Sequence, residues 1–186
     1  ITESLSMPMQ EWLQNGRLDI ALLYNPPASP ELESVHLMDD ALFVVTPRGR
    51  PDHISDNKDT AVESPATAEP IRLQDLAQRP LVMPSRPNAL RMLLERKMAD
   101  IGCEPRIAME IDGVPAILDL VSEGVGYAVL PGHAVQASAH PGQYLLHPIT
   151  EPHVIGQVYL VTSARRATTL TQQAMAELIR TTLQAL

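Results

Sequence analysis

The stretch PLVMPSRPNALRMLLERKMADIGCEP, residues 80–105, contains the change of hydrophobic period that most constrains the fold of this chain. Its first part, 81–83, is a short apolar run that predicts a buried strand. A helix is predicted to begin near Arg86, because the apolar residues that follow recur every three or four positions: Leu90, Leu93, Leu94, Met98 and Ile101. A strand that leads directly into a helix is typical of α/β folds.

The same alternation recurs along the rest of the chain. Strand-like segments have unbroken or alternating apolar residues and cover 17–27, 42–46, 125–131, 144–149 and 154–163. Helical segments have apolar residues three or four positions apart and cover 7–15, 72–78, 113–124, 133–139 and 168–186. The unbroken apolar run in 17–27 predicts a parallel strand covered on both faces. This order predicts an α/β fold with largely parallel sheets.

The segment from Arg50 to Pro70 is polar, acidic and rich in proline, and it has neither a helical nor a strand period. Such a composition predicts a linker or a mobile loop. It divides the chain into two lobes. We expect residues 1–50 and 163–186 to form the first lobe, 51–70 the linker, and 71–162 the second lobe.

Charge and composition exclude several functions for this segment. The net charge of −8, without a compensating basic cluster, argues against contact between these residues and nucleic acid. The single cysteine, Cys103, excludes an internal disulfide, and no apolar run reaches the length that spans a membrane. The chain opens at Ile1 without a secretory signal, which suggests a fragment of a longer cytoplasmic protein.

The sequence is poor in residues arranged for catalysis or metal binding. Six histidines are scattered among prolines and glycines, and no HExxH pair is present. Cys103 follows a helix-ending glycine and is expected to be a half-buried packing residue. Asp112 is expected to cap a helix. We therefore predict neither an enzyme nor a metal site, and no cofactor.

The turn Pro84–Asn88 allows two interpretations. The hydroxyl of Ser85 can cap the following helix, which is the ordinary use of a serine in this place. Alternatively, the partial positive charge of the helix N-terminus can bind a carboxylate or another anion. Pro84 and Pro87 fix φ and keep the turn preformed, and Asn88 offers both a donor and an acceptor. Taken alone, the turn favours simple capping.

A set of segments in a fixed order resembles the effector-binding domain of LysR-type transcriptional regulators. The segments are EWLQNGRLDIALLYNPP, MDDALFVVTPRGRP, IRLQDLAQRPLVMPSRPNALRMLLERKMADIGCEPRIAMEID, ILDLVSEGVGYAVLP and VYLVTSARRATTLTQQAMAELIRTTL. The pair GRLDIAL and EGVGYAVLP is the most characteristic. The resemblance covers nearly the whole chain, and within the family it is nearest to the nitrogen-assimilation-type branch.

The resemblance implies two Rossmann-like lobes, as in type 2 periplasmic binding proteins, joined by two crossover strands. A small polar or carboxylate effector would bind in the cleft between the lobes. It implies a homo-oligomer, a dimer for this domain and a tetramer for the full-length protein. DNA would be bound only through an N-terminal winged helix-turn-helix, which these residues do not include. The opening strand-helix unit of the first lobe would also precede Ile1.

The resemblance also implies which residues contact the effector. In the first lobe this residue would be Ser6, and near the hinge it would be Thr46. Those of the second lobe would be Ser85, Pro87, Asn88, Ala89, Gly113 and Val114. Two other functions stay open at this point: a solute-binding protein of periplasmic type with the same fold, and an enzyme on a related two-lobed scaffold. The first would carry a signal peptide upstream, and the second needs a nucleophile or acid–base pair.

Overall fold

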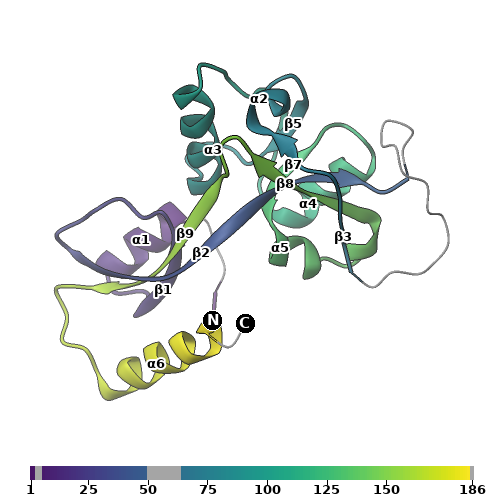
Figure 1. Ribbon diagram of the computed structural model, residues 1–186. Coiled ribbons are helices and arrows are strands. Elements are labelled where there is room, and N and C mark those ends of the chain that lie inside the picture. Colours follow the sequence, from purple (N-terminus) through teal and green to yellow (C-terminus); the bar gives the residue numbers. More distant parts are fainter. Residues whose placement is uncertain (3–5, 50–63, 185–186) are drawn as a thin grey trace. The chain divides into compact units, whose positions relative to one another are not determined.

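The structure is a computed structural model that describes residues 1–2, 6–49 and 64–184 (Figure 1). Most of the linker predicted at 51–70, its residues up to 63, therefore lies outside the described residues. The chain forms two compact units: unit 1 comprises Ile1–Asp40, Pro87–Ala89 and Gly156–Leu186, and unit 2 comprises Ala41–Arg86 and Leu90–Ile155. The chain passes between them within the long strand Leu32–Pro47, on either side of Pro87–Ala89, and at the start of the strand Ile155–Ser163. The lobe bounds expected from the sequence, at 50 and 163, stay a prediction.

Unit 1 contains an antiparallel pair of strands and the first part of a long strand, β2 (Leu32–Pro47), which lies in this unit up to Asp40. Helix α1 (Ser6–Gln14) packs against β1 (Ile20–Tyr24), and β1 pairs with β9 (Ile155–Ser163). The predicted parallel direction for β1 is therefore wrong, and so is its burial on both faces, because Leu22 is exposed. The core of the unit is aliphatic and consists of Leu13, Ala21, Leu23, Leu32 and Val161. Beside it, the Tyr24 hydroxyl donates to the Asp40 carboxylate.

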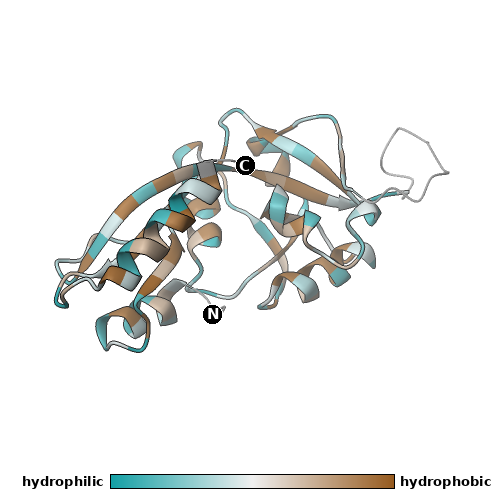
Figure 2. Ribbon diagram, turned by 90° about the horizontal axis from the view of Figure 1, so that it is seen from below, coloured by the Kyte–Doolittle hydropathy of each residue, from teal (hydrophilic) through white to brown (hydrophobic). Residues whose placement is uncertain are grey.

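The last helix, α6 (Leu170–Gln184), belongs to unit 1. Its existence confirms the helix predicted from residue 168. Several of its apolar side chains are exposed: Met175 and Leu178 are accessible, and Leu170 is 84% exposed. Hydrophobic and hydrophilic residues alternate along this and the other helices (Figure 2). Among the described residues, no helix is both long and apolar enough to cross a membrane.

Strands of mixed direction form the centre of unit 2. The long strand β2 (Leu32–Pro47) enters the unit at Ala41 and pairs antiparallel with β7 (Ala128–Pro131) and β8 (Tyr144–Thr150). The short strands β3 (Ala66–Thr67) and β4 (Ile71–Arg72) pair with β8 in parallel. Parallel pairing also joins β5 (Pro80–Met83) to β6 (Arg106–Glu110). The prediction of largely parallel sheets is therefore wrong, and the end of the predicted linker forms β3.

The helices of unit 2 follow its strands. They are α2 (Leu73–Leu76), α3 (Ala89–Asp100), α4 (Val114–Ser122), α5 (Gly132–Gln136) and the 3-10 turn Pro141–Gln143. Helix α4 packs against β5 and β7, and α5 packs against β7. Two aliphatic clusters fill the space between helices and strands, one around Leu81, Leu94 and Met98 and the other around Ile117, Leu118 and Val121. As predicted, Cys103 is half-buried.

Candidate functional site

The turn Pro84–Asn88 joins β5 to α3, and it differs from the prediction in where the helix begins. Helix α3 starts at Ala89, so Asn88 occupies the capping position. Ser85 lies four residues before the first helical residue. Because a capping residue directly precedes its helix, the prediction that the Ser85 hydroxyl caps α3 is wrong.

The backbone of Ser85 is instead tied to a second turn. Its N–H donates to Oδ1 of Asp112 at 2.9 Å. Asp112 follows β6, and α4 is capped by Gly113, whose φ of 96° is the left-handed conformation that glycine adopts readily. The prediction that Asp112 caps a helix is therefore wrong. Since β5 and β6 are parallel, both turns lie at the carboxyl edge of the strands, where α/β folds bind ligands.

Arg91 holds the first turn from the side of α3. Its side chain is buried, with 5% of the residue exposed. Its Nη1 donates to the carbonyl oxygen of Pro84 at 2.9 Å, Nε to Oε1 of Glu95 at 2.9 Å, and Nη2 to Oε1 of Glu110 at 2.8 Å. One guanidinium thus links the end of β5, the helix α3 and the end of β6. The three contacts use the fixed fork of donors that only arginine offers.

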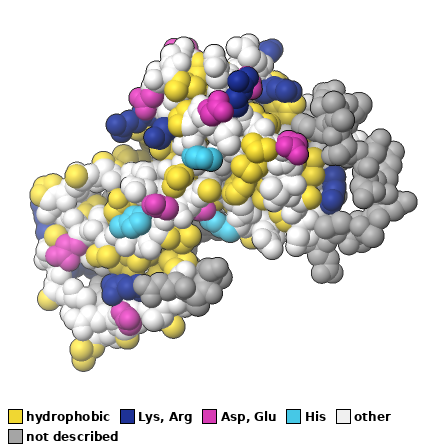
Figure 3. Space-filling view, viewed as in Figure 1, with side chains coloured by type: hydrophobic (Ala, Val, Ile, Leu, Met, Phe, Trp, Pro, Cys, Tyr) yellow, Lys and Arg dark blue, Asp and Glu magenta, His cyan; other side chains and the backbone are white. Residues whose placement is uncertain are grey.

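Glu95 also forms an ion pair with a second arginine, because Nη2 of Arg86 lies 2.8 Å from its Oε2. Burial raises the pKa of the Glu95 carboxyl, but hydrogen bonds from Arg86 and then Arg91 outweigh it and hold that pKa below its usual value. The hydrogen bond to Glu110, the largest influence, raises the pKa of Arg91. The result is a turn fixed at Pro84 by a carbonyl contact and at Arg86 by an ion pair. Basic and acidic side chains lie side by side over the region of α2 and α3 (Figure 3).

The structure brings part of the predicted site together. Ser85 and Gly113 belong to the two turns joined through Asp112, and Val114 is the first residue of α4. Pro87 and Asn88 lie between Ser85 and the start of α3, and Ala89 is the first residue of that helix. Ser6 is the half-buried first residue of α1, in unit 1.

Thr46 is not brought to the Ser85 turn. In the register of unit 2, Val45 lies opposite Ala128, and Tyr127 lies beside Leu81 at the start of β5. Ser85 lies beyond the other end of β5. At roughly 3.3 Å per residue along the strand, it is about 13 Å from Leu81. Thr46 is fully buried. Its contact with an effector stays a prediction without support from this geometry.

The Thr46 hydroxyl is bonded to a buried histidine. Its Oγ1 lies 3.0 Å from Nε2 of His147, and Nδ1 of the same ring lies 2.7 Å from the carbonyl oxygen of Glu69. A carbonyl oxygen only accepts, so Nδ1 carries a proton and donates to it. The contact joins β2 to β8 across 101 residues of sequence. Among the described residues, no three His, Cys, Asp or Glu side chains form a group that could hold a metal ion.

Sequence reasoning missed the roles of Arg91 and Asp112. The signal for Arg91 was its spacing: Arg91, Leu94 and Met98 fall on one helical stripe, and all three are buried. Ile101, which was expected on that face, is exposed. For Asp112 no local pattern distinguishes a helix cap from a carboxylate that binds a distant N–H.

The sequence of this chain is similar to those of known proteins. Residues 1–184 match the family described as the LysR substrate binding domain. The HTH-type transcriptional regulator BbuR of Bordetella bronchiseptica is 26% identical over 162 residues, which are 87% of this chain and 46% of BbuR. The chain spans about half the length, or less, of the curated relatives that it matches.

Two solved structures show the same fold. The regulatory domain of Synechocystis PCC6803 CcmR in complex with 2-PG has a TM-score of 0.79 and 16% identity, over 97% of this chain and 80% of that one. The effector binding domain of QuiR in complex with shikimate has a TM-score of 0.73 and 20% identity, over 94% and 76%. The fold is thus the mixed α/β fold of such domains, which is that of type 2 periplasmic binding proteins.

Proposed function

The chain belongs to the LysR substrate binding domain family, and on this premise we propose that it is the ligand-sensing domain of a bacterial LysR-type transcription regulator. The full-length protein would act in the cytoplasm and bind DNA through a separate N-terminal domain. The effector would be a small polar or carboxylate compound. Its binding, and no catalytic step, would be the activity of this domain.

The proposed binding surface is the pair of turns joined by Asp112. The observation that carries it is the hydrogen bond from Ser85 N–H to Asp112, together with the contact from Arg91 to the Pro84 carbonyl. A turn held at both ends is already ordered before a ligand arrives. Less conformational entropy is then lost on binding, which favours affinity.

The N-terminus of α3 supplies the attraction for the effector. A helix of 12 residues has a partial positive charge at its first turn, where Asn88 and Ala89 lie. A carboxylate or another acceptor on the effector would bind there. The Asp112 carboxylate lies against the same turn, so an effector with both an acceptor and a donor, such as a hydroxy acid, suits the two turns better than a simple anion.

The proposed signal is a population shift. An effector that binds one arrangement of the two lobes more tightly than another biases the equilibrium between them. The change in lobe arrangement would then alter the arrangement of subunits on DNA. We further propose a dimer for this domain and a tetramer for the full-length protein. Light scattering of each form would test these subunit numbers directly.

A thermal-shift screen of the 186-residue chain, with hydroxy acids, their deoxy analogues and amides, tests the proposal. Hits would be titrated by calorimetry against wild type, Asn88→Ala and Asp112→Ala. Loss of one hydrogen bond to the ligand should weaken binding by about 0.5–3 kcal/mol, or about twofold to more than a hundredfold.

A matched control is Asp119→Ala, which removes an aspartate from α4 away from the two turns and should leave affinity unchanged. Equal affinity in wild type, Asn88→Ala and Asp112→Ala would overturn the assignment of these turns. A hit whose deoxy analogue binds as tightly would overturn the preference for a hydroxy acid.

A further inference from the structure

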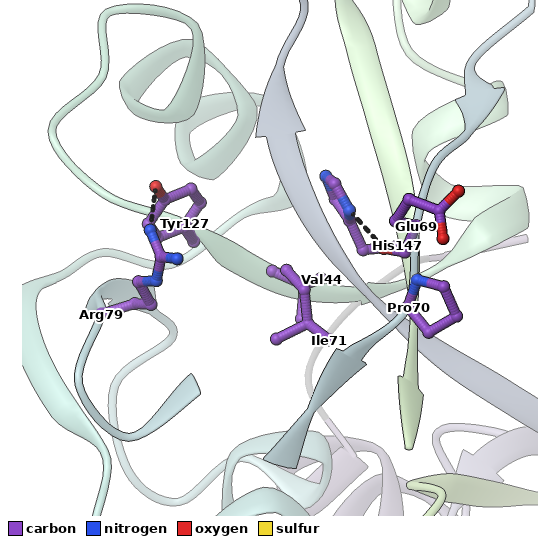
Figure 4. A pocket seen from close by; sticks show the side chains of 7 residues that line it. All are labelled: Val44, Glu69, Pro70, Ile71, Arg79, Tyr127 and His147. Atoms are coloured by element: carbon purple, nitrogen blue, oxygen red, sulfur yellow. Dashed lines mark hydrogen bonds between the residues drawn. The ribbon is translucent and has the colours of Figure 1, made fainter. Parts of the chain in front are cut away.

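A second place in unit 2 has the features of a binding site, and it lies at the edge of the strands opposite the Ser85 turn. It is a cavity of about 160 Å³ between β2, β4, β8 and the residues that precede β5 and β7 (Figure 4). Its lining includes Val44, Pro70, Ile71, Arg79, Tyr127 and His147. Arg79 precedes β5, and the Ser85 turn follows the other end of the same strand, so the two sites are distinct.

Arg79 provides the positive charge of the cavity. Its Nη1 donates to the Tyr127 hydroxyl at 3.2 Å, and the guanidinium carbon lies 5.6 Å from the centre of the Tyr127 ring. In the part of the chain that the structure describes, Arg79 forms no ion pair with a carboxylate, whereas Arg72, Arg86 and Arg91 each do. One contact to tyrosine uses one of five N–H donors, so the guanidinium has further donors to offer a ligand.

The rest of the lining is apolar or already bonded. Val44 and Ile71 lie between Arg79 and His147, and Pro70 follows on the side of His147 (Figure 4). The His147 ring is held by its contacts to Thr46 and to the carbonyl oxygen of Glu69. The Glu69 carboxylate points away from the side of the cavity where Arg79 lies (Figure 4). A ligand would therefore contact the Arg79 guanidinium on one side of the cavity and apolar side chains elsewhere in its lining.

We propose that this cavity binds a small organic anion, with its carboxylate on Arg79 and its apolar part on Val44, Pro70 and Ile71. A volume of about 160 Å³ has room for about five water molecules, at roughly 30 Å³ each. It suits an anion of about five to eight non-hydrogen atoms, such as a short aliphatic carboxylate. The site is independent of the effector turns.

The test is a titration of the ¹⁵N-labelled 186-residue chain with butyrate and with butyramide, which has the same shape but no charge. Butyrate should shift the amide resonances of Ile71 and Tyr127 with a dissociation constant in the millimolar range, and butyramide should shift them far less. Arg79→Gln should weaken butyrate binding about tenfold to a hundredfold, because charge-assisted hydrogen bonds are lost. Arg79→Lys should retain part of the affinity, since it keeps the charge but not the planar fork.

Two controls separate this site from other effects. Arg96→Gln removes an exposed arginine of α3 and should bind butyrate as wild type does. Asn88→Ala should also leave butyrate binding unchanged, even where it abolishes binding at the effector turns. Arg79 is itself exposed, so its variants are expected to fold. Equal shifts with butyramide, or undiminished butyrate binding by Arg79→Gln, would overturn the proposal, as would a titration that leaves Ile71 and Tyr127 unmoved.

Discussion

Replacing Arg91 by methionine tests whether a charge network holds the candidate site in place. The substitution keeps much of the aliphatic volume but removes the donors to Pro84, Glu95 and Glu110. Of its two arginine partners, Glu95 would keep Arg86, which is largely exposed. The carbonyl oxygen of Pro84 would lose its charged donor.

The expected loss of stability follows from these contacts. A hydrogen bond to a charged group contributes about 1.5–3 kcal/mol, so loss of the bond to Pro84 alone is of that order. Removing one partner of a fully buried ion pair costs about 3–5 kcal/mol, but here Glu95 keeps Arg86, and Glu110 is half exposed. The free energy of unfolding should therefore fall by about 2–4 kcal/mol in total.

Urea unfolding followed by circular dichroism measures this loss. With a slope of about 2 kcal/mol per molar urea, the midpoint should fall by roughly 1–2 M. Arg96→Met, an exposed change on the same helix, should shift the free energy of unfolding by less than about 0.5 kcal/mol. If Arg91→Met were no more destabilising than Arg96→Met, the network would not hold the turn.

The pH dependence of the Arg91→Met effect is a second readout. The folded-state pKa of Glu95 lies below its usual value, so its ion pairs stabilise the fold above the unfolded-state pKa, roughly 4.3. This stability is lost as the pH falls through the folded-state pKa. The difference between wild type and Arg91→Met should therefore shrink below about pH 4. A difference that stayed constant down to pH 3 would contradict the assignment.

Three further changes test other parts of the fold. Thr46→Val removes the hydroxyl partner of buried His147 and should cost about 1–3 kcal/mol in urea unfolding, whereas Thr46→Ser should cost less; equal costs would contradict a role for the hydroxyl. Gly126→Ala would place a Cβ 2.6 Å from the carbonyl oxygen of Pro80, so its melting temperature should fall; an unchanged value would refute this close approach. The pKa of Tyr24 is raised above its usual value, first by burial and then by the hydrogen bond to Asp40. Tyr24→Phe should therefore remove one tyrosine that ionises only at high pH from an alkaline ultraviolet titration. An unchanged absorbance rise at high pH would contradict that burial.

The local part of the candidate site could be predicted from the sequence. The change of period at 81–101 predicted a strand and a helix, and β5 and α3 confirm both. The start of the helix was misplaced by about three residues. Pro87 is compatible with a first helical turn, but the chain begins α3 only after Asn88, at the capping position.

The contacts that fix the site could not be predicted in the same way. Ser85 and Asp112 are 27 residues apart, and Thr46 and His147 are 101 apart. Hydrophobic period reports which face of an element is buried, but it does not report which distant polar group that face meets. Strand direction was missed for a related reason. The apolar run of β1 suggested a doubly covered parallel strand, yet its partner β9 runs antiparallel and leaves Leu22 exposed.

Hydrogen exchange of the 186-residue chain, with and without a hit from the effector screen, tests the central claim most directly. If the two turns bind the effector, amides in 84–90 and 112–115 should exchange more slowly when it is bound, because ligand contacts and reduced local opening protect them. Protection confined to other segments, with these two turns unchanged, would contradict the proposal that this domain senses its effector there.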